Sequence, residues 1–143
     1  MDKLDREILR ILTTDGRRSY RDIGEAVHLS ANAVAERVRR LQASGVIRAI
    51  RAVVEPAALG VTVEAQIDVK LRPTTSAEAF EAAIRYLPQV TSATLMTGSF
   101  DYALRVACAD RDELVDVTET IRNKAGALET YSRVILREVR LGG

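Results

Sequence analysis

A cluster of seven residues between Ser30 and Arg40 has the types and spacing needed to contact a nucleic acid. Guanidinium and amide groups hydrogen-bond to phosphates and base edges, and small residues let a helix enter the major groove closely. Arg37 lies on the flank of this face, where it could instead pair with an acidic residue of a preceding helix. The candidate DNA-contacting residues are Ser30, Asn32, Ala33, Glu36, Arg37, Arg39 and Arg40.

The segment from Ser19 to Gly45 predicts two short helices joined by a tight turn, which would position this cluster. Ser19 and Asp22 fit a capping box, so the first helix should begin at Tyr20. Ser30 suits the cap of the second helix, and Gly45 suits the left-handed residue that ends it. The pattern is typical of a helix-turn-helix that binds DNA. The alternative is an ordinary pair of helices with a solvated basic face.

A second cluster, Thr97-Gly98-Ser99-Phe100-Asp101, could bind a small molecule. Gly98 lets backbone amides approach a ligand, and the Asp101 carboxylate could hold an ammonium group. The alternative is a plain hairpin turn with an Asx bond from the aspartate. No Ser/His/Asp set, pair of catalytic carboxylates or metal-ligand cluster is present, so we expect no enzyme activity, cofactor or metal.

Charge divides the 143-residue chain into a basic front and an acidic rear. Residues 1–51 carry 11 Lys and Arg against 7 Asp and Glu, and residues 52–143 carry 10 against 13. Only the front should therefore meet phosphate. Cys108 is the only cysteine, which excludes an internal disulfide. The charged start is unlike a signal peptide, and no apolar run could span a bilayer, so we expect a cytoplasmic protein.

The pattern of apolar residues predicts an α+β protein in three parts. Residues 1–45 form a three-helix, helix-turn-helix domain, because helical spacing also covers residues 4–12. Residues 46–60 form a hinge, whose β-branched run 46–54 should be extended. Residues 61–143 form a ferredoxin-like β-α-β-β-α-β domain that would also provide self-association.

Within the rear domain, strands are expected at 61–71, 90–97, 102–108 and 128–139. Thr75 with Glu78 and Asp110 with Glu113 are expected to cap its two helices. Ala65 and its alternate neighbours should line the buried face of the first strand. The other face must be polar or find a partner, and the sequence leaves open which face or edge associates.

Five segments spread over nearly the whole chain have an informative order and spacing: LDREIL, DGRRSYRDI, HLSANAVAERVRRLQASGVI, EPAALG and MTGSFDYALRV. In these segments the chain resembles the Lrp/AsnC, or feast/famine, family of transcriptional regulators. The resemblance implies homodimers that join through the rear domains, often assemble further into octamers, and regulate transcription in response to an amino acid. It also implies an effector site at residues 97–101, between neighbouring dimers, with hydroxyls from Thr130 and Ser132.

Two residues depart from the family pattern: Gly24 stands where alanine is usual, and His28 where glycine is usual. Glycine inside a helix costs about 1 kcal/mol relative to alanine. Histidine at a position that requires positive φ is strained. We therefore expect a somewhat softer helix-turn-helix. His28 is interpreted as a surface turn residue, because a metal site needs several convergent ligands.

Two alternative functions remain at this point. The first is an effector-independent architectural protein that coats or bends double-stranded DNA. The second is a decarboxylase of tetrapyrroles, since siroheme decarboxylases share the family's fold. Those enzymes rely on histidine near the tetrapyrrole, whereas the only histidine here lies in the DNA-reading half.

Overall fold

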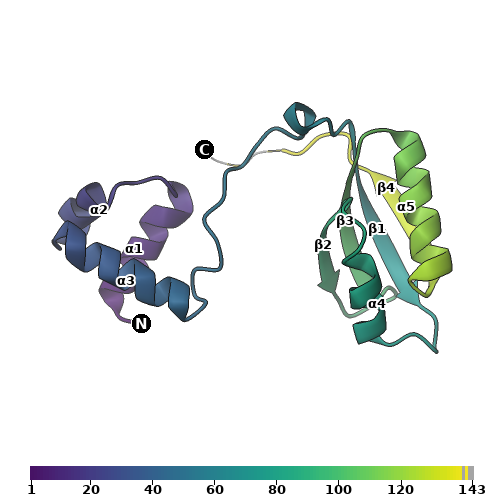
Figure 1. The fold of residues 1–143 in the computed structure, drawn as a ribbon, viewed down its shortest axis with the longest axis horizontal. Helices are drawn as coiled ribbons and strands as arrows, with labels where there is room; N and C mark the ends of the chain where they lie inside the picture. The colour runs from purple at the N-terminus through teal and green to yellow at the C-terminus, as the bar shows by residue number, and fades with distance from the viewer. Residues whose placement is uncertain (140, 142–143) are drawn as a thin grey trace. The chain divides into compact units, whose positions relative to one another are not determined.

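The computed structural model describes residues 1–139 and 141 and separates the chain into two compact units, Met1–Val53 and Val54–Gly143. The division falls inside the segment expected to form the hinge. Figure 1 shows a helical front unit and a rear unit built on a sheet. No helix in the described part of the chain is long and apolar enough to cross a membrane.

The front unit consists of three helices, α1 (Lys3–Thr14), α2 (Tyr20–Val27) and α3 (Ala31–Ala43). Each begins at a polar cap, because the first N–H groups of a helix have no partner within it. Ser30 Oγ accepts the N–H of Ala33 at 3.1 Å, as expected. Ser19 Oγ accepts the N–H of Asp22 at 3.0 Å, which is the first half of the predicted capping box. The shared core consists of Ile8, Ile23, Val27, Val34 and Val38.

Both departures from the family pattern lie at the turn between α2 and α3. His28 caps α2 in the left-handed conformation, with φ 59° and ψ 44°, so the expected strain is present. At Gly24, an added Cβ would lie 2.4 Å from the carbonyl oxygen of Leu29. In this chain the turn folds back against α2 so closely that the missing Cβ of Gly24 leaves room for it.

The segment 46–54 forms no strand, and Gly45 before it ends α3 with the predicted positive φ of 75°. A β-branched run becomes a strand only when a second strand satisfies its backbone groups. Within the described residues, Ile47 instead donates its N–H to Leu41 and packs on the helical core. The contacts of Ile47 with the helical unit therefore outweigh the preference of this β-branched run for a strand.

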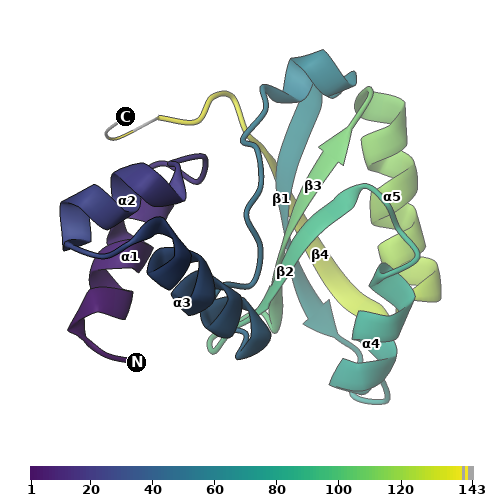
Figure 2. The same ribbon diagram turned by 60° about the vertical axis from the view of Figure 1, so that its left-hand side comes forward.

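The rear unit has the predicted βαββαβ order, after a short 3₁₀ helix η1 (Pro56–Leu59). Its elements are β1 (Val63–Leu71), α4 (Ala77–Ile84), β2 (Val90–Leu95), β3 (Tyr102–Cys108), α5 (Arg111–Lys124) and β4 (Ala127–Val134). The antiparallel sheet has the order β2-β3-β1-β4, which makes β2 and β4 its edges. Figures 1 and 2 show α4 and α5 against one face of the sheet. This is the ferredoxin-like arrangement that the sequence predicts.

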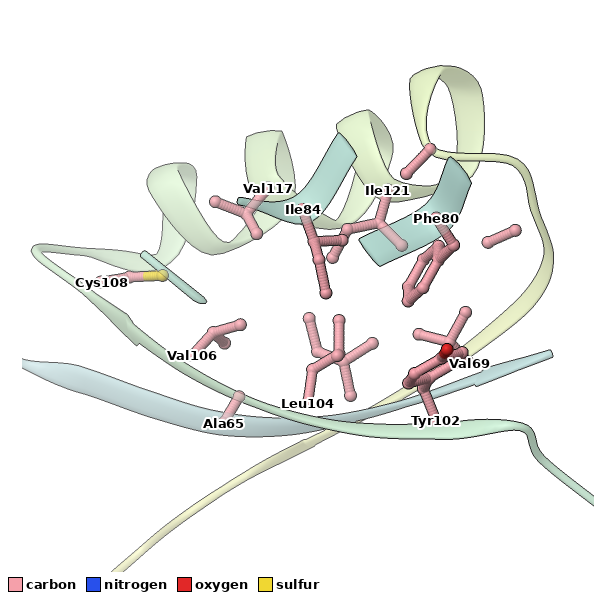
Figure 3. Close-up of a cluster of buried hydrophobic side chains, with 13 residues drawn as sticks. Ala65, Val69, Phe80, Ile84, Tyr102, Leu104, Val106, Cys108, Val117 and Ile121 are labelled. Carbon is pink, nitrogen blue, oxygen red and sulfur yellow. The ribbon is translucent and has the colours of Figure 1, made fainter. Parts of the chain in front are cut away.

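Alternation along β1 and β3 places the core between the helices and the sheet. In β1, Ala65, Ile67 and Val69 are buried on the helix side, and Glu64, Gln66 and Asp68 lie on the other, as predicted. Figure 3 shows Phe80 and Ile84 of α4 and Val117 and Ile121 of α5 directed at the residues of this face. Burying each large apolar side chain contributes about 1.5–3 kcal/mol.

Two predicted boundaries in the rear unit are wrong. Ser76, not Thr75, caps α4, and its Oγ accepts the N–H of Ala79 at 3.1 Å. The hydroxyl of Thr75 donates instead to the carbonyl of Gly126 at 3.0 Å. The last strand ends at Val134 rather than at residue 139. Ile135 still donates its N–H to the Glu64 carbonyl, but β1 begins at Val63, so residues 137–139 have no partner strand. Asp110 does cap α5, as expected.

Candidate DNA interface and ligand site

The exposed face of α3 carries four of the predicted DNA-contacting side chains. Asn32, Glu36, Arg39 and Arg40 are exposed on it, while Val34, Val38 and Leu41 are buried against α1 and α2. Ala33 is half-buried in the first turn, and Ser30 is occupied as the cap. The first turn therefore presents little bulk, which favours close approach of a helix to base edges.

Arg37 does not belong to this exposed face. Its Nη1 donates to Asp2 Oδ2 at 2.6 Å and to Asp5 Oδ1 at 2.8 Å, and its side chain is 19% exposed. Asp2 and Asp5 also form the capping box of α1, with bonds of 3.0 and 2.8 Å. The guanidinium thus ties α3 to the start of α1. Our assignment of Arg37 to DNA contact is best replaced by the alternative, an ion pair with the first helix.

Hydrogen bonds within this cluster favour the ionised form of each of its three groups. The pKa of Asp2 is lowered, first by the N–H of Asp5 and then by Arg37. The pKa of Asp5 is lowered in the same way, by the N–H of Asp2 and then by Arg37. The two carboxylates in turn raise the pKa of Arg37. The three groups stay ionised at neutral pH and hold the N-terminus of α1 against α3.

The two remaining arginines of α3 differ in how free they are. Arg39 is exposed and donates to the Glu36 carboxylate one turn earlier in the helix. Arg40 is exposed and makes no side-chain hydrogen bond or ion pair with any residue that the structure describes. Exposed ion pairs such as Arg39–Glu36 contribute little to folding stability, so Arg39 can readily exchange Glu36 for a phosphate. Arg40 is therefore the side chain most directly available to DNA.

A second group of basic side chains, not among the predicted DNA-contacting residues, lies beside the start of α2. Arg17 and Arg18 lie exposed in the turn before Ser19, and Arg21 is exposed on the first turn of α2, 3.3 Å from Glu25. In a helix-turn-helix, the first helix crosses the DNA backbone. The basic run DGRRSYRD is visible in the sequence, where it marks the start of α2 and carries part of the family resemblance.

The predicted ligand loop forms the hairpin between β2 and β3. Residues 97–99 are exposed, and Gly98 has φ 111°, which requires glycine. Asp101 is engaged with the sheet: its N–H donates to the Val69 carbonyl and its Oδ2 accepts the N–H of Leu71, both at 2.8 Å. Its Oδ1 makes no hydrogen bond to any described residue. The aspartate therefore has one free oxygen for a ligand.

Thr130 and Ser132 lie away from this loop in a single chain. They pair with Val69 and Ile67 of β1, so they project from β4 toward the helix side of the sheet. The hydroxyl of Thr130 already accepts the Nε–H of Arg122 in α5 at 2.8 Å. Because β1 separates β4 from β3, the loop strand and the hydroxyl strand are about 10 Å apart. The structure does not bring the two halves of the predicted site into one cavity.

A helix-turn-helix with an exposed basic face, followed by a ferredoxin-like domain, defines a DNA-binding regulator with a second, sensing domain. Family models agree with this division. An AsnC-type helix-turn-helix domain matches residues 1–42, and an Lrp/AsnC ligand binding domain matches residues 64–142. The chain belongs to the Lrp/AsnC family of transcriptional regulators, and not to a family of enzymes.

Two relatives illustrate the likeness in sequence. An HTH-type transcriptional regulator of Mycobacterium tuberculosis is 35% identical over 136 residues, covering 95% of this chain and 92% of the relative. The leucine-responsive regulatory protein of Salmonella typhimurium is 31% identical over 143 residues, covering 98% and 87%.

Two solved structures illustrate the likeness in fold. A feast or famine regulatory protein of M. tuberculosis, complexed with L-methionine, has a TM-score of 0.90 at 30% identity and covers 98% of this chain and 95% of its own. A transcriptional regulator of Neisseria meningitidis, also in complex with L-methionine, has a TM-score of 0.87 at 29% identity and covers 99% and 93%.

Proposed function

We propose that this regulator binds double-stranded DNA as a homodimer and that an amino acid, bound by the rear unit, changes its assembly or its affinity for DNA. Two copies of α3 would lie in successive major grooves, since a dimer sets two recognition helices one turn of DNA apart. Such a protein would work in the cytoplasm, in association with the nucleoid.

The exposed face of α3 supports the DNA-reading half of the proposal. Arg40 and Arg39 would contact phosphate or guanine, and Asn32 and Glu36 would face base edges. Ser30 and Ala33 would keep the entering turn narrow. Arg17 and Arg18 are added as phosphate contacts on the α2 side, and Arg37 would act indirectly by holding α3 in place.

The two methionine complexes among the relatives support an amino acid as the effector class. In this chain, the proposed site is Thr97-Gly98-Ser99-Phe100-Asp101, where the free oxygen of Asp101 would accept the α-ammonium group. Thr130 and Ser132 are separated from the loop by β1, so a site that includes them would combine the loop of one chain with β4 of another. This arrangement favours dimers joined through their rear units that assemble further, up to octamers.

The single observation that carries the proposal is that one chain combines an exposed basic face on α3 with a separate domain of the ligand-binding fold. Light scattering of the purified chain, with and without each amino acid and alongside a DNA titration, tests it. We expect a dimer or larger assembly whose mass or DNA affinity changes with at least one amino acid. An unchanged mass and affinity with every amino acid would favour the architectural alternative instead.

A further inference from the structure

A groove lies between α4 and the edge strand β2, on the helix side of the sheet. It is open to solvent and has a volume of about 380 Å³. Its apolar floor is formed by Ile84, Val90, Ala93, Leu95 and Tyr102, beside the polar Thr91 and Ser92. The side chains of Glu81 and Arg85 stand at its rim. Its volume lies within the range of sites for small molecules, about 300–1,000 Å³.

The groove exists because α4 is short and β2 is at the edge of the sheet. α4 ends at Ile84, and Leu95 is left 62% exposed on the helix face, opposite the buried Tyr102. Figure 3 shows Ile84 and Tyr102 reaching into the layer between the helices and the sheet. The apolar floor is therefore continuous with the core but open to solvent along β2.

The rim carries one carboxylate, Glu81, and one guanidinium, Arg85, and both have hydrogen-bonding groups without a partner among the described residues. Tyr102 donates its phenol proton to Glu81 Oε1 at 2.6 Å. Burial and this carboxylate raise the pKa of Tyr102 to about 12, so it remains a donor and holds Glu81 in place. Glu81 Oε2 and the Arg85 guanidinium make no hydrogen bond or ion pair with any described residue.

We propose that this groove binds a free α-amino acid with an apolar side chain, at a site separate from the hairpin loop. Arg85 would hold the α-carboxylate, Glu81 the α-ammonium group, and the floor of Ala93 and Leu95 the side chain. Glu81 and Arg85 are one helical turn apart, with Cβ atoms about 6 Å from each other. The two charged groups of an amino acid sit on one carbon, so both rim side chains can reach them together. The proposal does not depend on whether the loop binds an effector.

The test is a methyl NMR titration of the full chain with L-methionine. We expect the methyl signals of Ile84, Ala93 and Leu95 to shift and to saturate. Arg85→Gln and Glu81→Gln should each weaken binding by roughly tenfold or more, because each removes a charge-assisted contact. Glu81→Gln retains an oxygen that can accept the phenol of Tyr102. Arg111→Gln, which removes an exposed arginine of α5, is the matched control and should leave binding unchanged.

Two analogues assign the roles of the rim. N-acetyl-L-methionine lacks the ammonium group and should bind as weakly to the wild type as methionine binds to Glu81→Gln. L-methioninamide lacks the carboxylate and should match Arg85→Gln. Unmoved floor signals, or wild-type affinity in both variants, would overturn the site. Shifts confined to residues 96–101 would also overturn it, while supporting the loop as the effector site.

Discussion

The two turns to which we assign function, α2–α3 in the front unit and β2–β3 in the rear, are built in different ways. The front turn is specified by neighbours in sequence: Gly24, His28 and Ser30 set its path within a few residues. The rear turn is anchored by bonds from Asp101 to Val69 and Leu71, about thirty residues earlier in the chain. Local chemistry therefore fixes the path of the front turn, whereas register across the sheet fixes the path of the rear turn.

The largest expected effect comes from Gly24→Ala, which tests whether the front turn is as tight as the structure shows. Helix propensity alone predicts stabilisation by about 1 kcal/mol. Because the new Cβ would meet the Leu29 carbonyl oxygen at 2.4 Å, we expect the front unit to lose about 1–3 kcal/mol instead. Denaturant unfolding measures the difference. A more stable variant would show that the turn can relax.

Arg40→Ala tests whether the free arginine of α3 meets DNA. Loss of one such contact should weaken binding by roughly tenfold, while thermal stability stays the same. A titration at several salt concentrations separates two roles: a phosphate contact lowers affinity for all sequences, and a guanine contact relaxes one base position. The account fails here if the variant binds operator DNA as well as the wild type.

His28→Gly should stabilise the front unit without loss of DNA binding. Glycine removes the left-handed strain at φ 59°, which costs about 1–2 kcal/mol, but adds chain entropy to the unfolded state. The net gain should be about 0.5–1 kcal/mol, measured by thermal unfolding. A lower melting temperature would mean that the imidazole makes a contribution that outweighs the strain.

The smallest expected effect is the acid response of the cluster around Arg37. The pKa values of Asp2 and Asp5 lie below their usual 3.8, so their contribution to stability is complete above that value. It is lost as the pH falls through the lowered values, because the unfolded carboxyls take up protons first. Arg37→Ala should lower the melting temperature at pH 7 and narrow this acid dependence. An equal loss at pH 2 and pH 7 would contradict the ion-pair role.

The same contrast explains which features the sequence predicts. Helix starts at Tyr20, Ala31 and Arg111 follow from caps and apolar spacing, because these signals lie within one turn of the residues they control. Thr75 and Ser76 are neighbouring hydroxyl residues with the same capping chemistry. The distant carbonyl of Gly126, which binds Thr75, decides between them.

The placement of the site residues has a similar cause. On the helical wheel Arg37 lies beside the exposed residues of α3. Only the packing of α1 against α3 shows that Arg37 forms ion pairs with Asp2 and Asp5. Thr130 and Ser132 have suitable hydroxyls, but their distance from the loop depends on strand order and register, which spacing along the chain does not encode. Contacts between residues far apart in the sequence therefore decide which side chains such a site contains.

The most direct test of separate reading and sensing is a titration of labelled operator DNA with Asp101→Asn, with and without an amino acid that shifts the wild type. The asparagine oxygen can still accept the Leu71 N–H, so the loop should keep its anchor while losing its charge. We predict that the variant binds DNA like the wild type but no longer responds to the amino acid. A full response, or DNA binding lost together with it, would contradict the account.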